Sequence, residues 1–369
     1  MLDPIVDFFT RIFEMIGRGI GYVIAAILWP FVSVSRWYTR RGWIMRGVVG
    51  VLLVGWFALY AWFFWQTQRW NAFDVDYVAK YDFSSRTEKP GSPVADKPGT
   101  CGTSAIMQVA GDLIDFNVNQ NEWVPSLLVS KLGLFGLGWK YTPWFDNKAA
   151  FQLGINEIVR RTAQESVDRL GRVRGTSQID QGLQNARQNI YYTEDLWYVS
   201  LSPFGATTPT ATRYREAEKN FRDFNQRLSR CQAVFDPRAD NLLRFYDQMS
   251  NAIGSTSDIL NDQINASNAG WFDPRADDRF WFTYGQLYAL NGILGGLRVD
   301  FSDVVKERNL TKTFDEAQGQ LRAALNMQPM IISNGAESAF IMPSHLATMG
   351  FYLLRVRANI TEMRDILDR

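Results

Sequence analysis

The longest apolar run of this chain occupies residues 47–65, which read GVVGVLLVGWFALYAWFFW and contain no charged side chain. In a helix that rises about 1.5 Å per residue, a run of this length spans roughly 28 Å, close to the hydrocarbon thickness of a bilayer. Indole rings favour the headgroup layer, and four tryptophans lie near the ends of the run: Trp43, Trp62, Trp65 and Trp70. The run is too long for a signal peptide, and no small-residue cleavage site follows it. The pattern predicts one transmembrane helix at residues 47–65.

Charges on the two sides of this run predict its direction. Four arginines crowd the N-terminal side: Arg36, Arg40, Arg41 and Arg46. The other side carries Arg69 and Lys80 together with Asp74 and Asp76. Because basic loops stay in the cytoplasm, we expect residues 1–46 inside the cell and everything after the helix outside, in the periplasm of a single-pass inner-membrane protein.

The first thirty-five residues form a separate pattern. Apolar residues recur on one helical face at Ile5, Phe8, Phe9, Ile12 and Ile16, and charged ones recur on the opposite face at Asp7, Arg11, Glu14 and Arg18. This amphipathic helix runs into the uncharged stretch 19–35, which Pro30 interrupts. Two interpretations remain open: an interfacial helix on the cytoplasmic leaflet, or a short first span that forms a hairpin with the next. The periodic charges favour the interfacial helix.

Residues 66–100 predict a membrane-proximal segment that ends in a linker, because residues 83–99 are polar and rich in proline and glycine. Residues 101–369 predict a periplasmic bundle of helices. Helical periodicity marks residues 148–170 and 179–190. Three longer seams alternate steps of three and four: Tyr214, Ala217, Phe221, Phe224, Leu228 and Cys231; Phe280, Thr283, Leu287, Leu290, Leu294, Leu297 and Phe301; and Leu346, Met349, Leu353, Val356, Ile360, Met363 and Leu367. We expect the last seam to pack within the chain, on the helix from Phe280 to Phe301.

Two local motifs interrupt the helical pattern. Asn334-Gly335 between the apolar parts of residues 330–342 predicts a small β-hairpin before the last helix. The sextet FDPRAD occurs at residues 235–240 and again at 272–277. It lacks the alternating oxygen ligands and glycine of a calcium loop. It is typical of a helix start, with Asp236 and Asp273 as N-caps and the following proline at the first helical position.

The chain has two cysteines, Cys101 and Cys231. In an oxidising compartment they can pair, and the alternative is two buried thiols. The even count and the positions of the two residues, at a linker end and at a helix end, favour a disulfide. In the chain-entropy model a bridge that closes so long a loop contributes roughly 5 kcal/mol at most.

Composition removes several classes of chemistry. The formal net charge of +1 gives no field that attracts nucleic acid, so we expect no such partner. A single histidine, His345, and the lack of any CxxC pair argue against zinc, haem and Ser-His or Cys-His catalysis, so no cofactor or metal is expected. His345 is interpreted as a capping or core residue. The acid pairs Glu194-Asp195 and Asp277-Asp278 are poor glycosidase candidates, because adjacent side chains do not converge on one substrate.

One polar stretch is a candidate anion or partner patch, with Arg169, Arg172 and Arg174 around two glycines. Thr176 and Ser177 follow, and together these five residues could form an anion-binding helix junction. The alternative is a solvated helix that ends at Gly171, where arginines complement the helix dipole. We favour this alternative.

Four stretches resemble one family: WVPS at residues 123–126, PWFDNKAAFQLGI at 143–155, DRLGRVRGTSQID at 168–180 and FDPRADNL at 235–242. In combination they look like an uncharacterised proteobacterial membrane family, domain of unknown function 2333. The similarity covers most of the chain, from the transmembrane helix to the last helix. It implies an inner-membrane protein of a Gram-negative bacterium. It implies no activity, substrate or catalytic residue.

The leading functional hypothesis is a non-enzymatic envelope protein, in which the periplasmic bundle assembles with itself or with other envelope proteins at the lipid bilayer. The long apolar seams and the amphipathic N-terminal helix motivate it. The alternative is an enzyme or ligand-binding domain that acts on cell-wall or lipid material; a pocket that holds Arg172, Arg174 and a carboxylate of raised pKa would favour it. A sensor is disfavoured, since about 46 residues are expected inside the cell.

Overall fold

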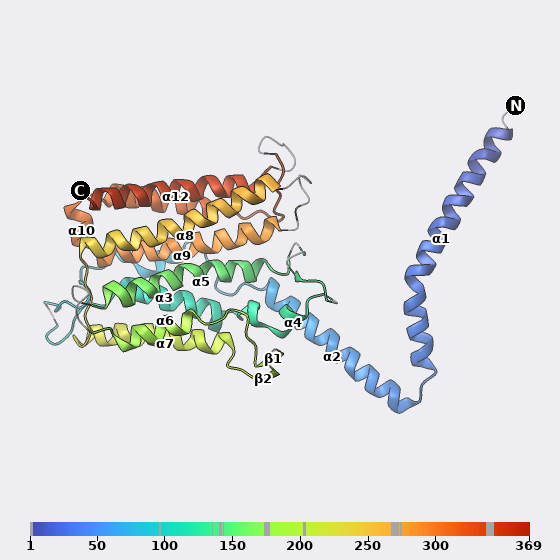
Figure 1. Ribbon diagram of the computed structural model, residues 1–369, viewed down its shortest axis with the longest axis horizontal. Coiled ribbons are helices and arrows are strands. Elements are labelled where there is room, and N and C mark those ends of the chain that lie inside the picture. Colours follow the sequence, from blue (N-terminus) through green and yellow to red (C-terminus); the bar gives the residue numbers. More distant parts are fainter. Residues whose placement is uncertain are drawn as a thin grey trace. The chain divides into compact units, whose positions relative to one another are not determined.

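The structure is a computed structural model that describes residues 3–95, 97–134, 136–139, 142, 144–172, 178–201, 204–266, 273, 275–336 and 343–369 (Figure 1). The chain divides into two compact units, residues 1–62 and 63–369. The first unit contains α1 (Asp3–Thr39) and most of α2 (Trp43–Gln68), and the second begins inside the end of α2.

The predicted apolar span lies inside α2. Among the described residues, α2 is the one helix that is long and apolar enough to cross a membrane. In contrast, α1 does not end at the uncharged stretch but continues through Pro30 to Thr39. The helix extends beyond the predicted amphipathic segment, and α1 does not qualify as a second span in its described part.

The second unit is mainly helical, as predicted. Its helices are α3 (Ala105–Asp115), α4 (Leu128–Leu132), α5 (Asn147–Glu165), α6 (Gln181–Ile190), α7 (Thr210–Ser229), α8 (Ala239–Ala266), α9 (Ala276–Asp300), α10 (Ser302–Glu307), α11 (Thr311–Leu325) and α12 (His345–Leu367). Shorter 3₁₀ turns cover Tyr77–Tyr81, Phe83–Ser85 and Val124–Ser126, and π-helical turns cover Phe116–Gln120 and Ser166–Leu170. The strands β1 (Val199–Leu201) and β2 (Phe204–Ala206) pair antiparallel, with Val199 opposite Ala206.

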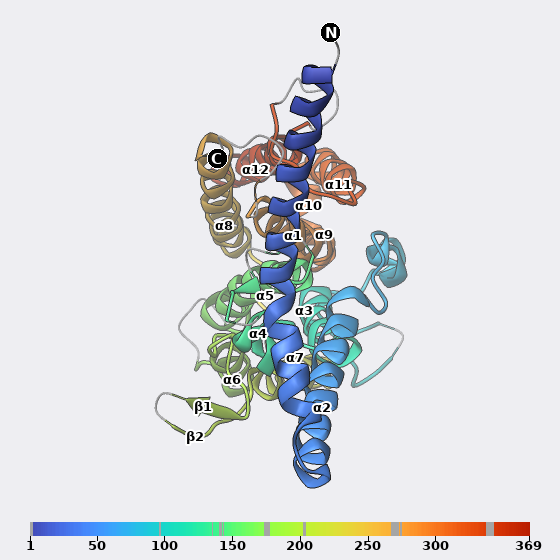
Figure 2. The same ribbon diagram turned by 90° about the vertical axis from the view of Figure 1, so that its right-hand side faces the viewer.

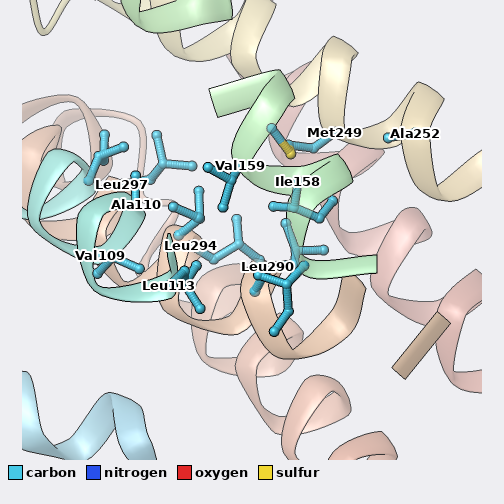
Figure 3. Packing of buried hydrophobic residues seen from close by; sticks show 14 of the residues in the cluster. Val109, Ala110, Leu113, Ile158, Val159, Met249, Ala252, Leu290, Leu294 and Leu297 are labelled. Atoms are coloured by element: carbon cyan, nitrogen blue, oxygen red, sulfur yellow. The ribbon is translucent and has the colours of Figure 1, made fainter. Parts of the chain in front are cut away.

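The bundle is organised around α9, which packs on α5, α3 and α11, while α12 covers α8 and α11, and α6 and α7 form the opposite side (Figures 1 and 2). Because α9 has neighbours around it, nearly all of its residues are buried. Figure 3 shows Leu290, Leu294 and Leu297 of α9 among side chains of α3, α5 and α8. The closest approach is between α5 and α9, where a Cβ on Gly154 would lie 2.0 Å from the Phe282 carbonyl oxygen. Glycine is therefore required at this crossing.

The three predicted seams are buried except at Cys231, the exposed end of the first, and the partner of the last seam needs a correction. Every seam residue of α12 except Leu367 is fully buried. The helix packs inside the same chain, but mainly on α8 and α11 and much less on α9. The expectation that α9 is its partner was wrong, because α9 is already enclosed by α5, α3 and α11 and leaves little of its surface to α12.

Side-chain caps fix several helix starts. Ser104, Asp180 and Ser344 each accept a hydrogen bond from the backbone N–H three residues on, at the starts of α3, α6 and α12. Both sextets do precede helix starts, yet α8 and α9 begin at the alanine of the sextet, so the aspartates are not the N-caps. Asp236 instead binds the Arg238 side chain, and Asp273 accepts from the Gln263 amide. Asp236 thus makes a local contact, and Asp273 contacts the end of the preceding helix, α8, before α9 begins.

Within the described residues, the two-stranded antiparallel sheet lies at residues 199–206. The end of the predicted hairpin, residues 337–342, lies outside the described residues, and an isolated antiparallel bridge joins Asn334 to Ser344. His345 begins α12, and its Nδ1 accepts from the Ser333 N–H at 3.0 Å. Burial lowers the pKa of His345, consistent with this structural role.

The segment between α2 and α3 is folded onto the bundle in its described part. Trp70, Phe73 and Tyr81 pack against the core, and the Tyr77 hydroxyl donates to the Tyr288 carbonyl at 2.8 Å. Further along, Pro93 forms a bridge with Cys101. The division between units falls at residue 62, whereas the sequence suggested a domain that starts at residue 101; aromatic side chains in the intervening segment draw it onto the helices.

Candidate functional site

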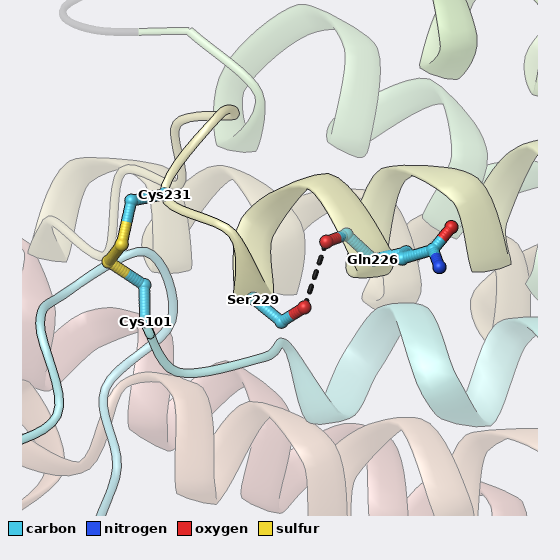
Figure 4. The surroundings of a disulfide bond; sticks show 4 residues. All are labelled: Cys101, Gln226, Ser229 and Cys231. Carbon is cyan, nitrogen blue, oxygen red and sulfur yellow. Dashed lines mark hydrogen bonds between the residues drawn. A yellow bond between two sulfur atoms is a disulfide. The ribbon is translucent and has the colours of Figure 1, made fainter. Parts of the chain in front are cut away.

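A disulfide joins Cys101 to Cys231, 130 residues apart (Figure 4). The Cys101 N–H donates to the Ser229 carbonyl at 2.9 Å, so the backbone beside the bridge is also paired. The bond ties the strand-like entry to α3 to the end of α7. It agrees with the pairing that the sequence favoured, and it points to an oxidising compartment.

An open cavity of about 400 Å³ lies between the end of α5 and the first half of α8. Its lining contains four residues from α5 and the π-helical turn that follows, and four from α8: Gln164, Glu165, Asp168, Arg169, Arg244, Asp247, Gln248 and Asn251. The cavity therefore has both acidic and basic groups, as expected of a site for a polar ligand.

Glu165 is the most perturbed group of this cavity. Its side chain is only 5% exposed, and its Oε2 has no hydrogen-bond partner among the described residues. Burial raises the pKa of Glu165 to about 7, against a smaller lowering by the Arg169 charge. An acid that titrates near neutral pH in a cavity is a candidate proton donor or acceptor.

The other charges of the cavity are largely paired. Arg364 donates to Asp247 at 2.8 Å, and Arg187 pairs with Asp168 at 3.0 Å. Arg169 lines the same cavity, and its charge acts on Glu165, whose pKa it lowers. An arginine beside an acid that titrates near neutral pH suits a polar or anionic ligand.

A π-helical turn, Ser166–Leu170, places Glu165 and Arg169 at this cavity. The Gly171 N–H donates to the Ser166 carbonyl five residues back at 2.8 Å, and the Ser166 hydroxyl donates to the Thr162 carbonyl at 2.6 Å. The wider turn changes which residues face α8 at the end of α5. Such π-turns are frequent at functional sites.

A second acidic cluster lies where α5 and α9 begin. Burial raises the pKa of Asp146 to about 9, and the charges of Asp278 and Asp277 add to the effect. Burial also raises the pKa of Asp277 to about 7. With its amide suitably oriented, Asn147 donates to Asp277 at 3.1 Å and accepts from the Trp281 indole N–H at 3.3 Å. Like charges in a buried site cannot all ionise, so protons are shared here at neutral pH.

The predicted anion patch is only partly assembled in the described structure. Arg169 lines the cavity, whereas Arg172 does not. Arg174, Thr176 and Ser177 lie outside the described residues. The cap of α6 is Asp180, three residues beyond Ser177. Among the described residues, no group of three or more His, Cys, Asp or Glu is arranged to hold a metal ion.

Sequence reasoning missed Glu165, Asp247 and Asp146. Glu165 carried a signal, because it continues the apolar face of α5 one step after Ile158 and Thr162, and an acid on an apolar face is unusual. Asp247 and Asp146 carried none. Each becomes part of a cluster only through contact with another helix, and the sequence pattern does not specify which helices pack together.

The described structure defines a class: a helical bundle with one disulfide, preceded by one helix able to cross a membrane. The family model described as "Uncharacterized protein conserved in bacteria (DUF2333)" matches residues 139–270 and 261–369, so the chain belongs to that family. The resemblance that the sequence suggested is thus confirmed. No curated protein and no solved structure is similar enough to this chain to count as a match.

We expect Glu165→Gln to reduce the dependence of stability on pH. The folded pKa of about 7 lies above the ordinary value of 4.5, so the native state holds this proton more tightly than the unfolded state does. The contribution of the Glu165 proton to stability is complete below pH 4.5 and is lost as the pH rises through about 7. Urea unfolding of the detergent-solubilised chain, followed across this range, measures the change.

The matched control is Glu157→Gln, because this acid lies on the same helix but is paired with Arg161. The variant Glu165→Gln should lose less stability than the wild type between acidic and neutral pH, and the control should follow the wild type. An unchanged pH dependence in Glu165→Gln would show that this carboxyl is solvated.

Proposed function

We propose that this protein is a single-pass inner-membrane scaffold, whose bundle lies in the periplasm and assembles with itself or with other envelope proteins. One observation carries the proposal: the last turn of the apolar helix is built into the folded bundle. A partner bound to the bundle is therefore held close to the end of the apolar helix.

Buried contacts hold this turn. Phe63 and Thr67 are each 1% exposed, and the Phe63 ring lies 5.1 Å from the Trp139 ring. The Lys148 ammonium donates to the carbonyls of Gln66 at 2.9 Å and Arg69 at 2.7 Å. These are carbonyls at the end of α2, which a helix leaves without internal partners. A cation there also complements the helix dipole, although burial lowers the pKa of Lys148 to about 8.

Two further features support the periplasmic side. Arginines before the apolar run and aspartates after it follow the charge distribution of a helix whose N-terminus is cytoplasmic. A disulfide within the bundle is typical of proteins that fold in an oxidising compartment.

A reporter fusion tests the topology. A reporter that is active only in the periplasm, fused after Arg369, should be active, and one that is active only in the cytoplasm should be silent. The reverse result would refute the proposed orientation. Crosslinking in native membranes, followed by mass spectrometry, tests the scaffold: a stable oligomer or envelope partner is expected, and a protein found only as a monomer without partners argues against it.

The cavity at Glu165 and Arg169 favours a second candidate, a domain that binds polar cell-wall or lipid material. Peptidoglycan fragments and glycerol phosphate, added separately, should raise the melting temperature of the wild type if this candidate holds. Arg169→Ala should reduce the effect, and Arg230→Ala, on an arginine that does not line the cavity, should not. A melting temperature that neither ligand changes would remove this candidate.

A further inference from the structure

Large exposed apolar side chains gather at one end of the bundle. The segment after α4 presents Leu137 at 67% and Trp144 at 52% exposure. Phe204, the first residue of β2, is 83% exposed. Met330, in the connection between α11 and α12, is 90% exposed. Figure 1 shows that α4, the two strands and the start of α12 all lie at this same end.

This end is also where the last turn of α2 enters the bundle. The Phe64 ring lies 5.8 Å from the Phe145 ring, and the Gln68 amide donates to the Trp144 carbonyl at 3.1 Å. The apolar run ends at Trp65, only three residues before Gln68. Since Phe64 itself belongs to the apolar run, its contact with Phe145 places the neighbouring Trp144 beside the last turn of that run.

That depth corresponds to the boundary between hydrocarbon and headgroups. Tryptophan favours this layer, because its ring is amphipathic. Leu137 and Trp144 belong to the same segment, which packs on α2 through Trp139 and Phe145. A bilayer crossed by α2 therefore comes up to these side chains without any additional partner.

The strands are connected to the same region. Lys131 at the end of α4 pairs with Asp195, shortly before β1, at 3.4 Å, and the Trp123 indole N–H donates to the Glu194 carbonyl at 2.7 Å. A two-stranded hairpin has little stability of its own in water, and Phe204 adds nothing to the core. Phe204 is meaningful only together with Leu137 and Trp144, because several exposed apolar side chains gathered at one end mark a surface that contacts an apolar partner.

We propose that Leu137, Trp144 and Phe204 form a membrane-seating surface, which inserts into the outer headgroup layer of the bilayer that α2 crosses. The surface restricts the tilt of the bundle. It thereby keeps the cavity at Glu165 and Arg169 at a set height above the lipid. The inference rests on the proposed membrane span.

The test uses single cysteine variants of the full chain, labelled with an environment-sensitive fluorophore. The protein is reconstituted in phosphatidylethanolamine–phosphatidylglycerol vesicles that contain doxyl-labelled lipid. Leu137→Cys and Phe204→Cys should show blue-shifted emission and strong quenching by a doxyl group near the headgroup. Leu354→Cys is the control, because Leu354 is 51% exposed but lies on the flank of the bundle along α12, and it should stay unquenched.

Val54→Cys, in the apolar run of α2, separates the two claims. Absence of quenching at Val54 by a doxyl group deep in the acyl chain would overturn the membrane span itself. Quenching at Val54 without quenching at Leu137 and Phe204 would leave the span and overturn the seating surface. Shielding of Leu137 and Phe204 from aqueous iodide without lipid quenching would assign the surface to a second copy of the chain and also overturn the proposal.

Discussion

Replacement of both cysteines, Cys101→Ser with Cys231→Ser, should lower the free energy of unfolding of the bundle by about 5 kcal/mol at most. The bond closes a loop of 130 residues, and a loop this long gives the unfolded chain a large entropy once it is opened. The loss is a large part of the stability of an ordinary domain. Urea unfolding of the purified chain, with and without reductant, measures it.

The control for this experiment is Ser229→Ala. Ser229 is two residues from Cys231, and its hydroxyl donates only within α7, to the Gln226 carbonyl at 2.8 Å (Figure 4). Its replacement should change stability little. In freshly lysed cells without reductant, both thiols of the wild type should resist alkylation. Labelling of Cys101 and Cys231 under these conditions would contradict both the bridge and its contribution.

The helices could be predicted from the sequence because their buried faces repeat at helical spacing. Phe221, Phe224 and Leu228 recur at steps of three and four, and all three are fully buried on α7. The apolar run could be recognised for a related reason, since charge is absent over a length that matches a bilayer. The pattern within one segment is therefore sufficient to predict that the segment is helical and which of its residues are buried.

The partners of helices could not be predicted in this way. The seam of α12 fits α8 as well as α9 by spacing, and the choice depends on which surface the rest of the bundle leaves open. The acidic clusters have the same origin: Asp146 precedes α5, and Asp277 lies in the first turn of α9. Their shifted pKa values arise only when the close crossing at Gly154 brings these two helices together.

Of the predicted site residues, Arg169 lines a cavity. The structure explains why the sequence pattern around Arg169 did not identify the other residues that line it. The π-helical turn Ser166–Leu170 changes the periodicity, so a helical projection based on 3.6 residues per turn misplaces the side chains after Glu165. The second half of the cavity comes from Arg244 and Asp247 of α8. No spacing within α5 points to them.

Leu353→Ala should destabilise the bundle by about 2–5 kcal/mol, because truncation of a buried leucine leaves a cavity that its surroundings fill only in part. Leu353 is fully buried in the seam of α12 that packs on α8 and α11 of the same chain. An intramolecular seam predicts a lower melting temperature that does not depend on protein concentration. Thermal unfolding of the detergent-solubilised chain at several concentrations checks both statements.

Leu354→Ala is the matched control, since it makes the same chemical change one residue further along the same helix. Leu354 is 51% exposed, so its truncation opens no buried cavity and should have a small effect on the melting temperature. The comparison also separates packing within the chain from assembly between chains. A Leu353→Ala protein of unchanged stability that instead dissociates from an oligomer would place the seam at a subunit interface, and the packing of α12 on α8 would then belong to the assembly.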